Sequence, residues 1–132
     1  MKIYLASNFN DHKQMVDLKN KLEFEGQHKV VSSWHTSPAL KLDHDYKDDP
    51  NEFVRAEVKL HALRDLREID LCDCFVVDLT NITHTGGKHV EFGYAMYKGK
   101  ILFTIGEASN IFHELATHNF VDIDEAVKFF RG

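Results

Sequence analysis

Short apolar runs alternate with amphipathic segments along the chain, and this alternation predicts the secondary structure. Apolar runs at 2–6, 73–79 and 100–105 have the length of buried strands. The continuous run at 73–79 is typical of a central strand in a parallel sheet. Further strands are expected at 28–34 and, very short, at 120–121. Strands separated by helices favour a parallel sheet.

Helical spacing of apolar residues predicts the connections between these strands. We expect helices at 11–25, 51–68, 88–98, 110–117 and 124–130. The longest should bury one stripe of side chains, namely Val54, Val58, Ala62, Leu63 and Leu66. The polar stretch 35–50 shows no periodicity and is expected to be a long loop.

Together these elements predict an α/β fold: a doubly wound (flavodoxin-like or Rossmann-like) five-stranded parallel sheet with helices on both faces. We find neither a repeat nor a linker, and 132 residues suit a single domain spanning 1–132. Ligands of such sheets bind beyond the carboxyl ends of the strands, where the strand order reverses. Functional residues are therefore expected in three loops, at 7–10, at 79–87 and near 106–110.

Composition and charge narrow the classes of partner. The chain has 16 Lys and Arg against 21 Asp and Glu, a net charge of −5, and no basic block. Neither a nucleic acid polymer nor a membrane is therefore an expected partner. Cys72 and Cys74 are expected to be buried, reduced thiols, which fits a cytoplasmic location. The nine histidines show no metal-binding spacing, so we expect no metal and no cofactor.

The segment 85–95 (TGGKHVEFGYA) carries the candidate chemistry. Gly86 and Gly87 at a helix start let backbone N–H groups approach an anion, and the helix dipole adds to the attraction. Glu91 falls about one turn into that helix. Gly93 costs about 1 kcal/mol relative to alanine, which predicts close packing of the helix against the sheet. A plain tight turn would explain the two glycines equally well.

Together with an aspartate on the preceding helix, this segment resembles the nucleoside 2-deoxyribosyltransferase family, including its relatives that hydrolyse 2′-deoxynucleoside 5′-monophosphates. The similarity extends from the opening KIYLAS through Asp65, Asp73 and the GGKHVEFGYA block to the strand after it. It implies that Glu91 is the catalytic glutamate, that Asp65 is the catalytic aspartate, and that Tyr4 contacts the glutamate. Members of the family are oligomers, so a homodimer or a higher homo-oligomer is expected.

The resemblance also implies a set of substrate-binding residues. Transferases of the family usually carry an aspartate at the position of Thr85, where it holds the sugar 5′-hydroxyl. A threonine hydroxyl and glycine N–H groups can instead donate to a 5′-phosphate, which an aspartate would repel. Both deoxynucleosides and their 5′-monophosphates therefore stay open as substrates. The expected binding residues are Ser7, Asn8, Phe9, Thr85, Gly86, Gly87, Lys88 and His89.

The implied reaction explains the need for two carboxylates. Cleavage of an N-glycosidic bond develops positive charge at the sugar C1′ and negative charge on the departing base. Glu91 would attack C1′ and form a covalent deoxyribosyl-glutamate, while Asp65 would protonate the base. Attack by a second base gives transfer, and attack by water gives hydrolysis. The alternative from another functional class is a module that binds nucleotides without cleaving them. For Asp65 alone, the ordinary explanation is a solvated charge on the face of a helix.

Overall fold

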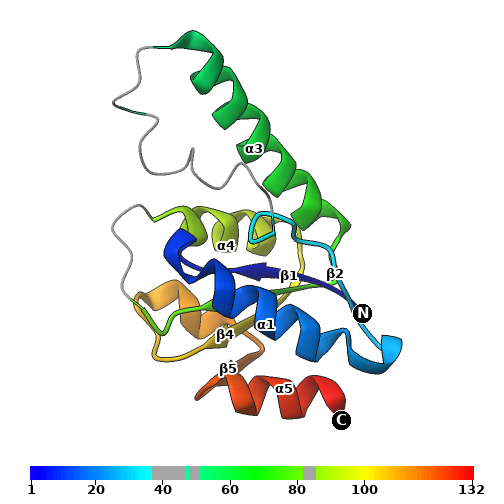
Figure 1. Cartoon of the computed structure of the whole chain (residues 1–132). Coiled ribbons are helices and arrows are strands. Elements are labelled where there is room, and N and C mark those ends of the chain that lie inside the picture. The colour runs from blue at the N-terminus through cyan, green and yellow to red at the C-terminus, as the bar shows by residue number, and fades with distance from the viewer. Residues whose placement is uncertain (37–46, 48–50, 82–85) are drawn as a thin grey trace.

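Five parallel strands form the centre of the molecule (Figure 1). The computed structural model describes residues 1–36, 47, 51–81 and 86–132, so most of the predicted loop at 35–50 lies outside the described residues. The strands are β1 (Lys2–Ala6), β2 (Lys29–Val30), β3 (Cys74–Asp78), β4 (Ile101–Ile105) and β5 (His118–Phe120). Their order is β2-β1-β3-β4-β5, and every neighbouring pair is parallel. The predicted doubly wound fold is confirmed.

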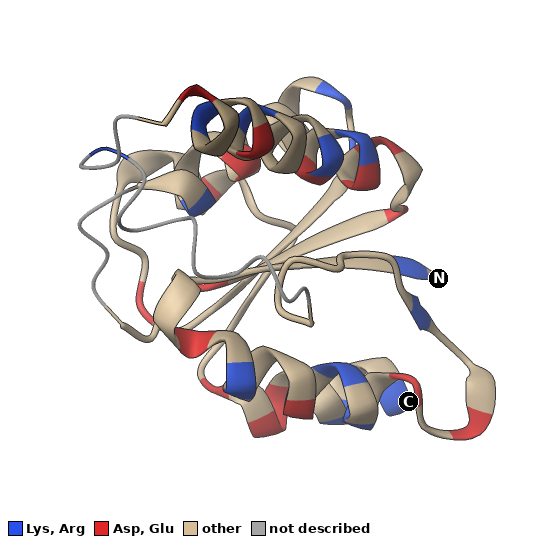
Figure 2. Ribbon diagram, turned by 45° about the horizontal axis from the view of Figure 1, so that its top comes forward, with Lys and Arg blue, Asp and Glu red and all other residues tan. Residues whose placement is uncertain are grey.

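Helices cover both faces of this sheet (Figure 2). They are α1 (His12–Leu22), α3 (Glu52–Leu71), α4 (Gly87–Tyr97) and α5 (Ile123–Arg131), with 3₁₀ helices η1 (Phe9–Asp11), η2 (Phe24–Gly26) and η5 (Ile111–Leu115). Helices α1 and α5 contact each other, as do α3 and α4. Acidic and basic positions are interspersed along them. In the part of the chain that the structure describes, no helix is long and apolar enough to cross a membrane.

The core is built on β1 and β3, the strands at the centre of the sheet. Every residue of β3 is buried, as the apolar run at 73–79 predicts. Cys72 and Cys74 are buried free thiols, and burial raises the pKa of the Cys74 thiol to about 12. That thiol therefore stays protonated at neutral pH.

Strand β2 is shorter than the predicted strand at 28–34. Beyond β2, side chains take over the hydrogen bonds that a longer strand would make. The Ser32 hydroxyl accepts from the backbone N–H of Leu5 at 3.0 Å, and the Trp34 indole N–H donates to the Leu5 carbonyl at 2.7 Å. Trp34 is consequently a core residue. The alternating sequence of this stretch could not show that side chains replace the strand ladder.

The helix α3 departs from its predicted pattern. It starts and ends later than the predicted 51–68, and Ile69 is its one buried residue. Ala62 and Leu63 of the predicted stripe are exposed. Val54, Val58 and Leu66 of that stripe are half-buried, and Leu66 packs against the core. The half-buried face also includes Asp65 and Glu68, because part of it borders a group of polar residues.

The other differences concern short elements. The helix predicted at 11–25 ends at Leu22, and η2 follows with Glu25 in a left-handed conformation (φ 65°). The helix predicted at 110–117 is the 3₁₀ helix η5, and the strand predicted at 120–121 is β5, which begins two residues earlier. Such boundaries depend on backbone hydrogen bonds that apolar spacing does not report.

Gly93 does not pack as the sequence predicts. It is exposed on α4, and among the described residues a Cβ added there meets no atom outside the backbone of its own helix within 4 Å. We therefore expect Gly93→Ala to raise the free energy of unfolding by up to about 1 kcal/mol, because alanine has the higher helix propensity. Denaturant unfolding measures the change. Gly86→Ala is the control and should destabilise, since Gly86 has φ +75°; a destabilised Gly93→Ala protein would contradict the open environment seen here.

Candidate active site

The order of the strands reverses between β1 and β3, the point where ligands of such sheets bind. Polar side chains join the carboxyl ends of these two strands. The Ser7 hydroxyl donates to Asp78 Oδ2 at 3.2 Å. The backbone N–H and the hydroxyl of Thr80 donate to Asp78 Oδ1 at 3.0 and 2.6 Å. Asp78 is buried and was missed in the sequence, where its only signal is an acidic residue near the end of an apolar run. Ser7, predicted to bind substrate, is a buried link between the strands.

Two further predicted residues support the loop that follows β3. Asn8 Nδ2 donates to the carbonyl of Asn81 at 3.1 Å. Lys88 Nζ donates to the carbonyls of Asp78 and Asn81, both at 3.0 Å, and burial lowers the pKa of this ammonium group. The structure thus gives Lys88 a supporting role inside the loop, and its contact with a substrate stays a prediction. Phe9 lies in η1 beside the ring of His12.

The two glycines open α4. Gly86 is its N-cap with a left-handed backbone (φ 75°), a conformation that glycine adopts without strain. The Gly86 carbonyl accepts from the N–H groups of His89 and Val90, and Gly87 is the exposed first residue of the helix. A helix start of this kind attracts anions. Thr85 lies outside the described residues.

Tyr4 and Glu91 are in direct contact. Tyr4 on β1 is fully buried, its ring stacks on Phe75 with centroids 5.5 Å apart, and its hydroxyl donates to Glu91 Oε2 on α4. Burial raises the pKa of Tyr4 well above its ordinary value, and the charges of Glu91 and Asp65 raise it further. The phenol is therefore a permanent donor to the glutamate at neutral pH.

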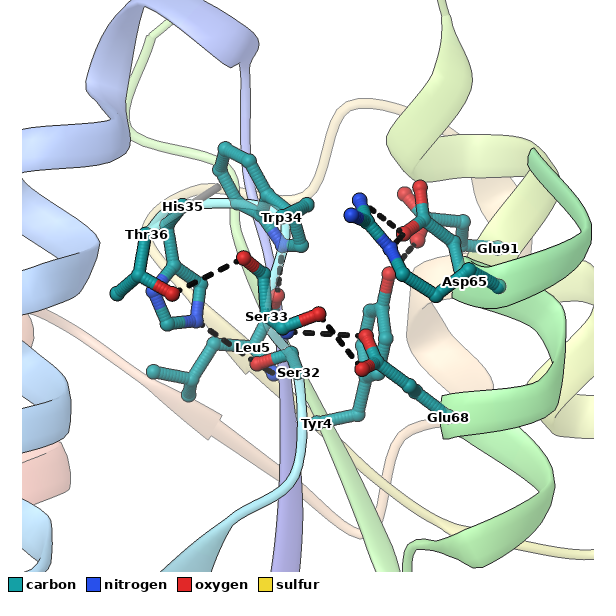
Figure 3. A network of polar contacts seen from close by, with 11 residues as sticks. Tyr4, Leu5, Ser32, Ser33, Trp34, His35, Thr36, Asp65, Glu68 and Glu91 are labelled. Atoms are coloured by element: carbon teal, nitrogen blue, oxygen red, sulfur yellow. Dashed lines mark hydrogen bonds and ion pairs between the residues drawn. The ribbon is translucent and has the colours of Figure 1, made fainter. Parts of the chain in front are cut away.

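Asp65 reaches the same place from α3. Figure 3 shows the Asp65 and Glu91 side chains near the Tyr4 hydroxyl, and both carboxylates act on the pKa of that phenol. Asp65 is half-buried, and Arg64 Nη2 lies 3.2 Å from its Oδ1. The three residues that the sequence nominated as catalytic thus come together from β1, α3 and α4, although they are far apart in the chain.

A third acidic side chain, Glu68, was missed. Its Oε1 accepts from the Ser33 backbone N–H at 2.9 Å, and its Oε2 accepts from the Ser33 hydroxyl at 2.6 Å. Its charge also raises the pKa of Tyr4, after those of Glu91 and Asp65. The spacing from Asp65 could have indicated it, because residues three apart share a helix face.

His89 lies on another side of α4, beside His113. Their ring centroids are 5.3 Å apart, and burial lowers the pKa of both. His113 Nδ1 accepts from the backbone N–H groups of Ser109 and Asn110, which completes the cap of η5. Within the described ranges, no group of three His, Cys, Asp or Glu side chains could hold a metal ion.

The raised pKa of Tyr4 predicts a pH dependence of stability. Above about pH 10, where an unfolded tyrosine loses its proton, folded Tyr4 keeps it, so the folded state binds more protons and stability falls as pH rises. We expect unfolding free energy to fall more steeply between about pH 9 and about pH 11 in the wild type than in Tyr4→Phe. Tyr97→Phe, at an exposed position, should keep the wild-type slope. Equal slopes for all three proteins would show that Tyr4 titrates normally.

Comparison with known proteins identifies the fold. No protein-family model and no curated protein sequence matches the chain. Among solved structures, a 2-deoxyribosyltransferase from the psychrotolerant bacterium Bacillus psychrosaccharolyticus is 20% identical, with 96% of this chain and 90% of that chain covered and a TM-score of 0.67. The CMP N-glycosidase BcmB of Clostridium botulinum is 17% identical, with 99% and 98% covered and a TM-score of 0.57. The chain therefore shares, over nearly its whole length, the fold of a 2-deoxyribosyltransferase and of a CMP N-glycosidase, as the sequence resemblance predicts.

Proposed function

We propose that this protein is a member of the nucleoside 2-deoxyribosyltransferase family that cleaves the N-glycosidic bond of 2′-deoxynucleosides or their 5′-monophosphates. The observation that carries the proposal is the meeting of Glu91 and Asp65 at the hydroxyl of Tyr4. The fold supports it, since one protein with this fold is a deoxyribosyltransferase and another an N-glycosidase.

In the proposed reaction Glu91 is the nucleophile. Tyr4 donates to Glu91 Oε2, and this hydrogen bond orients the carboxylate for attack on the sugar C1′. The C1′–oxygen bond of a glutamyl ester forms as the C1′–nitrogen bond to the base breaks. Asp65 supplies a proton to the departing base. An acceptor base or water then attacks C1′, releases Glu91 and returns a proton to Asp65.

The start of α4 is the proposed site for the 5′ end of the sugar. Gly86 caps the helix and Gly87 begins it, the first N–H groups of a helix have no acceptor within the helix, and Thr85 precedes both glycines in the sequence. These donors suit a 5′-phosphate as well as a 5′-hydroxyl. Hydrolysis of a monophosphate is the second candidate reaction, and the fold shared with a CMP N-glycosidase favours it.

Glu91→Gln should abolish cleavage, because an amide cannot form the ester. We expect a fall in rate of at least about 10³-fold. The assay incubates the protein with dCMP or dGMP, and separately with deoxynucleosides plus a free acceptor base, and follows free base and exchanged nucleoside by chromatography. Intact-protein mass spectrometry should detect a deoxyribosyl adduct in the wild type and none in Glu91→Gln.

Asp124→Asn changes an exposed carboxylate on α5 and serves as the control. It should keep full activity. Free base without exchange identifies a hydrolase, and exchange identifies a transferase. If the wild type binds nucleotide and forms no product after long incubation, the protein is a nucleotide-binding module and not an enzyme.

We also propose that the protein forms homo-oligomers, with a second copy covering the outer face of α3. This face exposes the apolar side chains of Phe53, Leu60, Leu63 and Leu71, the first of them 81% exposed. Two such helices paired antiparallel about a two-fold axis would place Phe53 against Leu71 of the other copy. The same pairing would place Glu57 opposite Arg67, so that the face is complementary to itself in charge as well.

Leu60→Glu should convert the oligomer to a monomer, because it buries a carboxylate in the proposed interface. Light scattering after size-exclusion chromatography measures the mass. Ile111→Glu, the same kind of change on the exposed surface of η5, should leave the mass unchanged. A wild type that is already monomeric at micromolar concentration would overturn this assembly.

A further inference from the structure

Helix α3 carries a proposed catalytic residue yet has little apolar anchorage. Of its 20 residues, Ile69 is the one that is fully buried, and Leu66 packs partly buried against the core beside it. Two neighbouring apolar side chains near one end of a long helix constrain its rotation and its position along the axis only weakly. The position of Asp65 therefore also depends on polar contacts made by the same helix.

Near the carboxyl end of α3, the described residues show exposed contacts of Asp70 and a half-buried contact of Glu68; at Asp70, the backbone carbonyl accepts from Lys100 Nζ at 2.8 Å. Asp70 accepts from the Tyr94 hydroxyl at 2.7 Å and lies 3.4 Å from Lys98 Nζ, which ties α3 to α4. This contact is exposed, and exposed ion pairs hold a helix weakly. The other contact is the pair of hydrogen bonds from Ser33 to Glu68, which is half-buried.

The Glu68–Ser33 contact leads directly to β1. The residues on either side of Ser33 are bonded to Leu5, through the Ser32 hydroxyl and the Trp34 indole N–H (Figure 3). Leu5 follows Tyr4 in the strand. An unbroken path of hydrogen bonds and covalent bonds thus runs from α3 to the residue whose hydroxyl holds Glu91.

We propose that Glu68 is a positioning residue: by binding Ser33 through both carboxylate oxygens, it fixes α3 against the end of β1 and so places Asp65 over Tyr4 and Glu91. This inference rests on the proposed function for its catalytic consequence. Because both oxygens of Glu68 are engaged by Ser33, Glu68 is assigned no contact with substrate.

Three variants separate a positioning role from a role of charge. Glu68→Gln keeps the contact, since the amide oxygen accepts from the Ser33 N–H and the amide N–H₂ donates to the Ser33 hydroxyl. Its kcat should stay within about threefold of the wild type. Glu68→Ala loses both bonds, and kcat should fall by about 10- to 100-fold with a smaller change in KM. Ser33→Ala loses one bond and should lie between them.

A double-mutant cycle tests whether Glu68 acts through Asp65. In an Asp65→Asn background, Glu68→Ala should lower kcat no further, because the group that it positions is already disabled. Glu52→Ala, an exposed carboxylate in the first turn of α3, is the control and should match the wild type. Three results would overturn the proposal. The first is an equal fall of kcat on Glu68→Ala in both backgrounds, and the second is an unchanged kcat in Glu68→Ala. The third is a loss of kcat in Glu68→Gln as large as that in Glu68→Ala.

A second measurement does not depend on catalysis. The Tyr4 ring is labelled with ¹³C at Cζ, and its titration is followed by NMR. Glu68→Gln removes one of the charges that raise the Tyr4 pKa, whereas Glu68→Ala should lower the pKa further, because Asp65 also moves away. A larger pKa shift in Glu68→Ala, in a protein whose wild type cleaves neither deoxynucleosides nor their 5′-monophosphates, would refute the proposed function and retain the positioning role. Equal shifts in the two variants would refute the positioning role.

Discussion

The buried hydroxyl of Tyr4 constrains the centre of this molecule. A polar atom that leaves water needs a hydrogen-bond partner inside the protein, and Glu91 is that partner. The bond joins β1 to α4 across the face of the sheet. It also requires the carboxylate to stay where the phenol can reach it, so the same interaction satisfies the core and orients the group that we propose as the nucleophile. A single polar contact here serves folding and, in the proposed reaction, chemistry.

Much of the fold follows from the sequence because it depends on apolar burial. The runs that became β1, β3 and β4 are mostly apolar, with Thr104 as a polar residue inside β4, and hydrophobic segments of this kind identify central parallel strands. The end of β2 could not be predicted, since it depends on two side chains that bond to Leu5 in place of the strand ladder. The 3₁₀ helix η5 is similar, because the Asn110 and His113 side chains determine where it starts.

The candidate site divides in the same way. Tyr4, Asp65 and Glu91 were nominated from a family resemblance, and the structure brings them together. Asp78 and Glu68 were missed, because each is defined by its partners, Ser7 and Ser33, which are distant in the chain. Sequence patterns report which face of an element is apolar. They do not report which polar residues on the remaining face find one another, and such contacts decide the geometry of a site.

The side chains that end β2 also affect how this sheet meets other chains. An open strand edge offers unpaired N–H and C=O groups on which a further strand can assemble, and this is a common start of aggregation. Strand β2 is only two residues long and pairs with Lys2 and Ile3, so the carboxyl half of β1 would present such an edge. The Ser32 hydroxyl and the Trp34 indole occupy both backbone groups of Leu5 there. These two side chains therefore block the addition of a strand from another molecule at this edge. They do so without a longer β2, so the chain can leave the sheet after Val30.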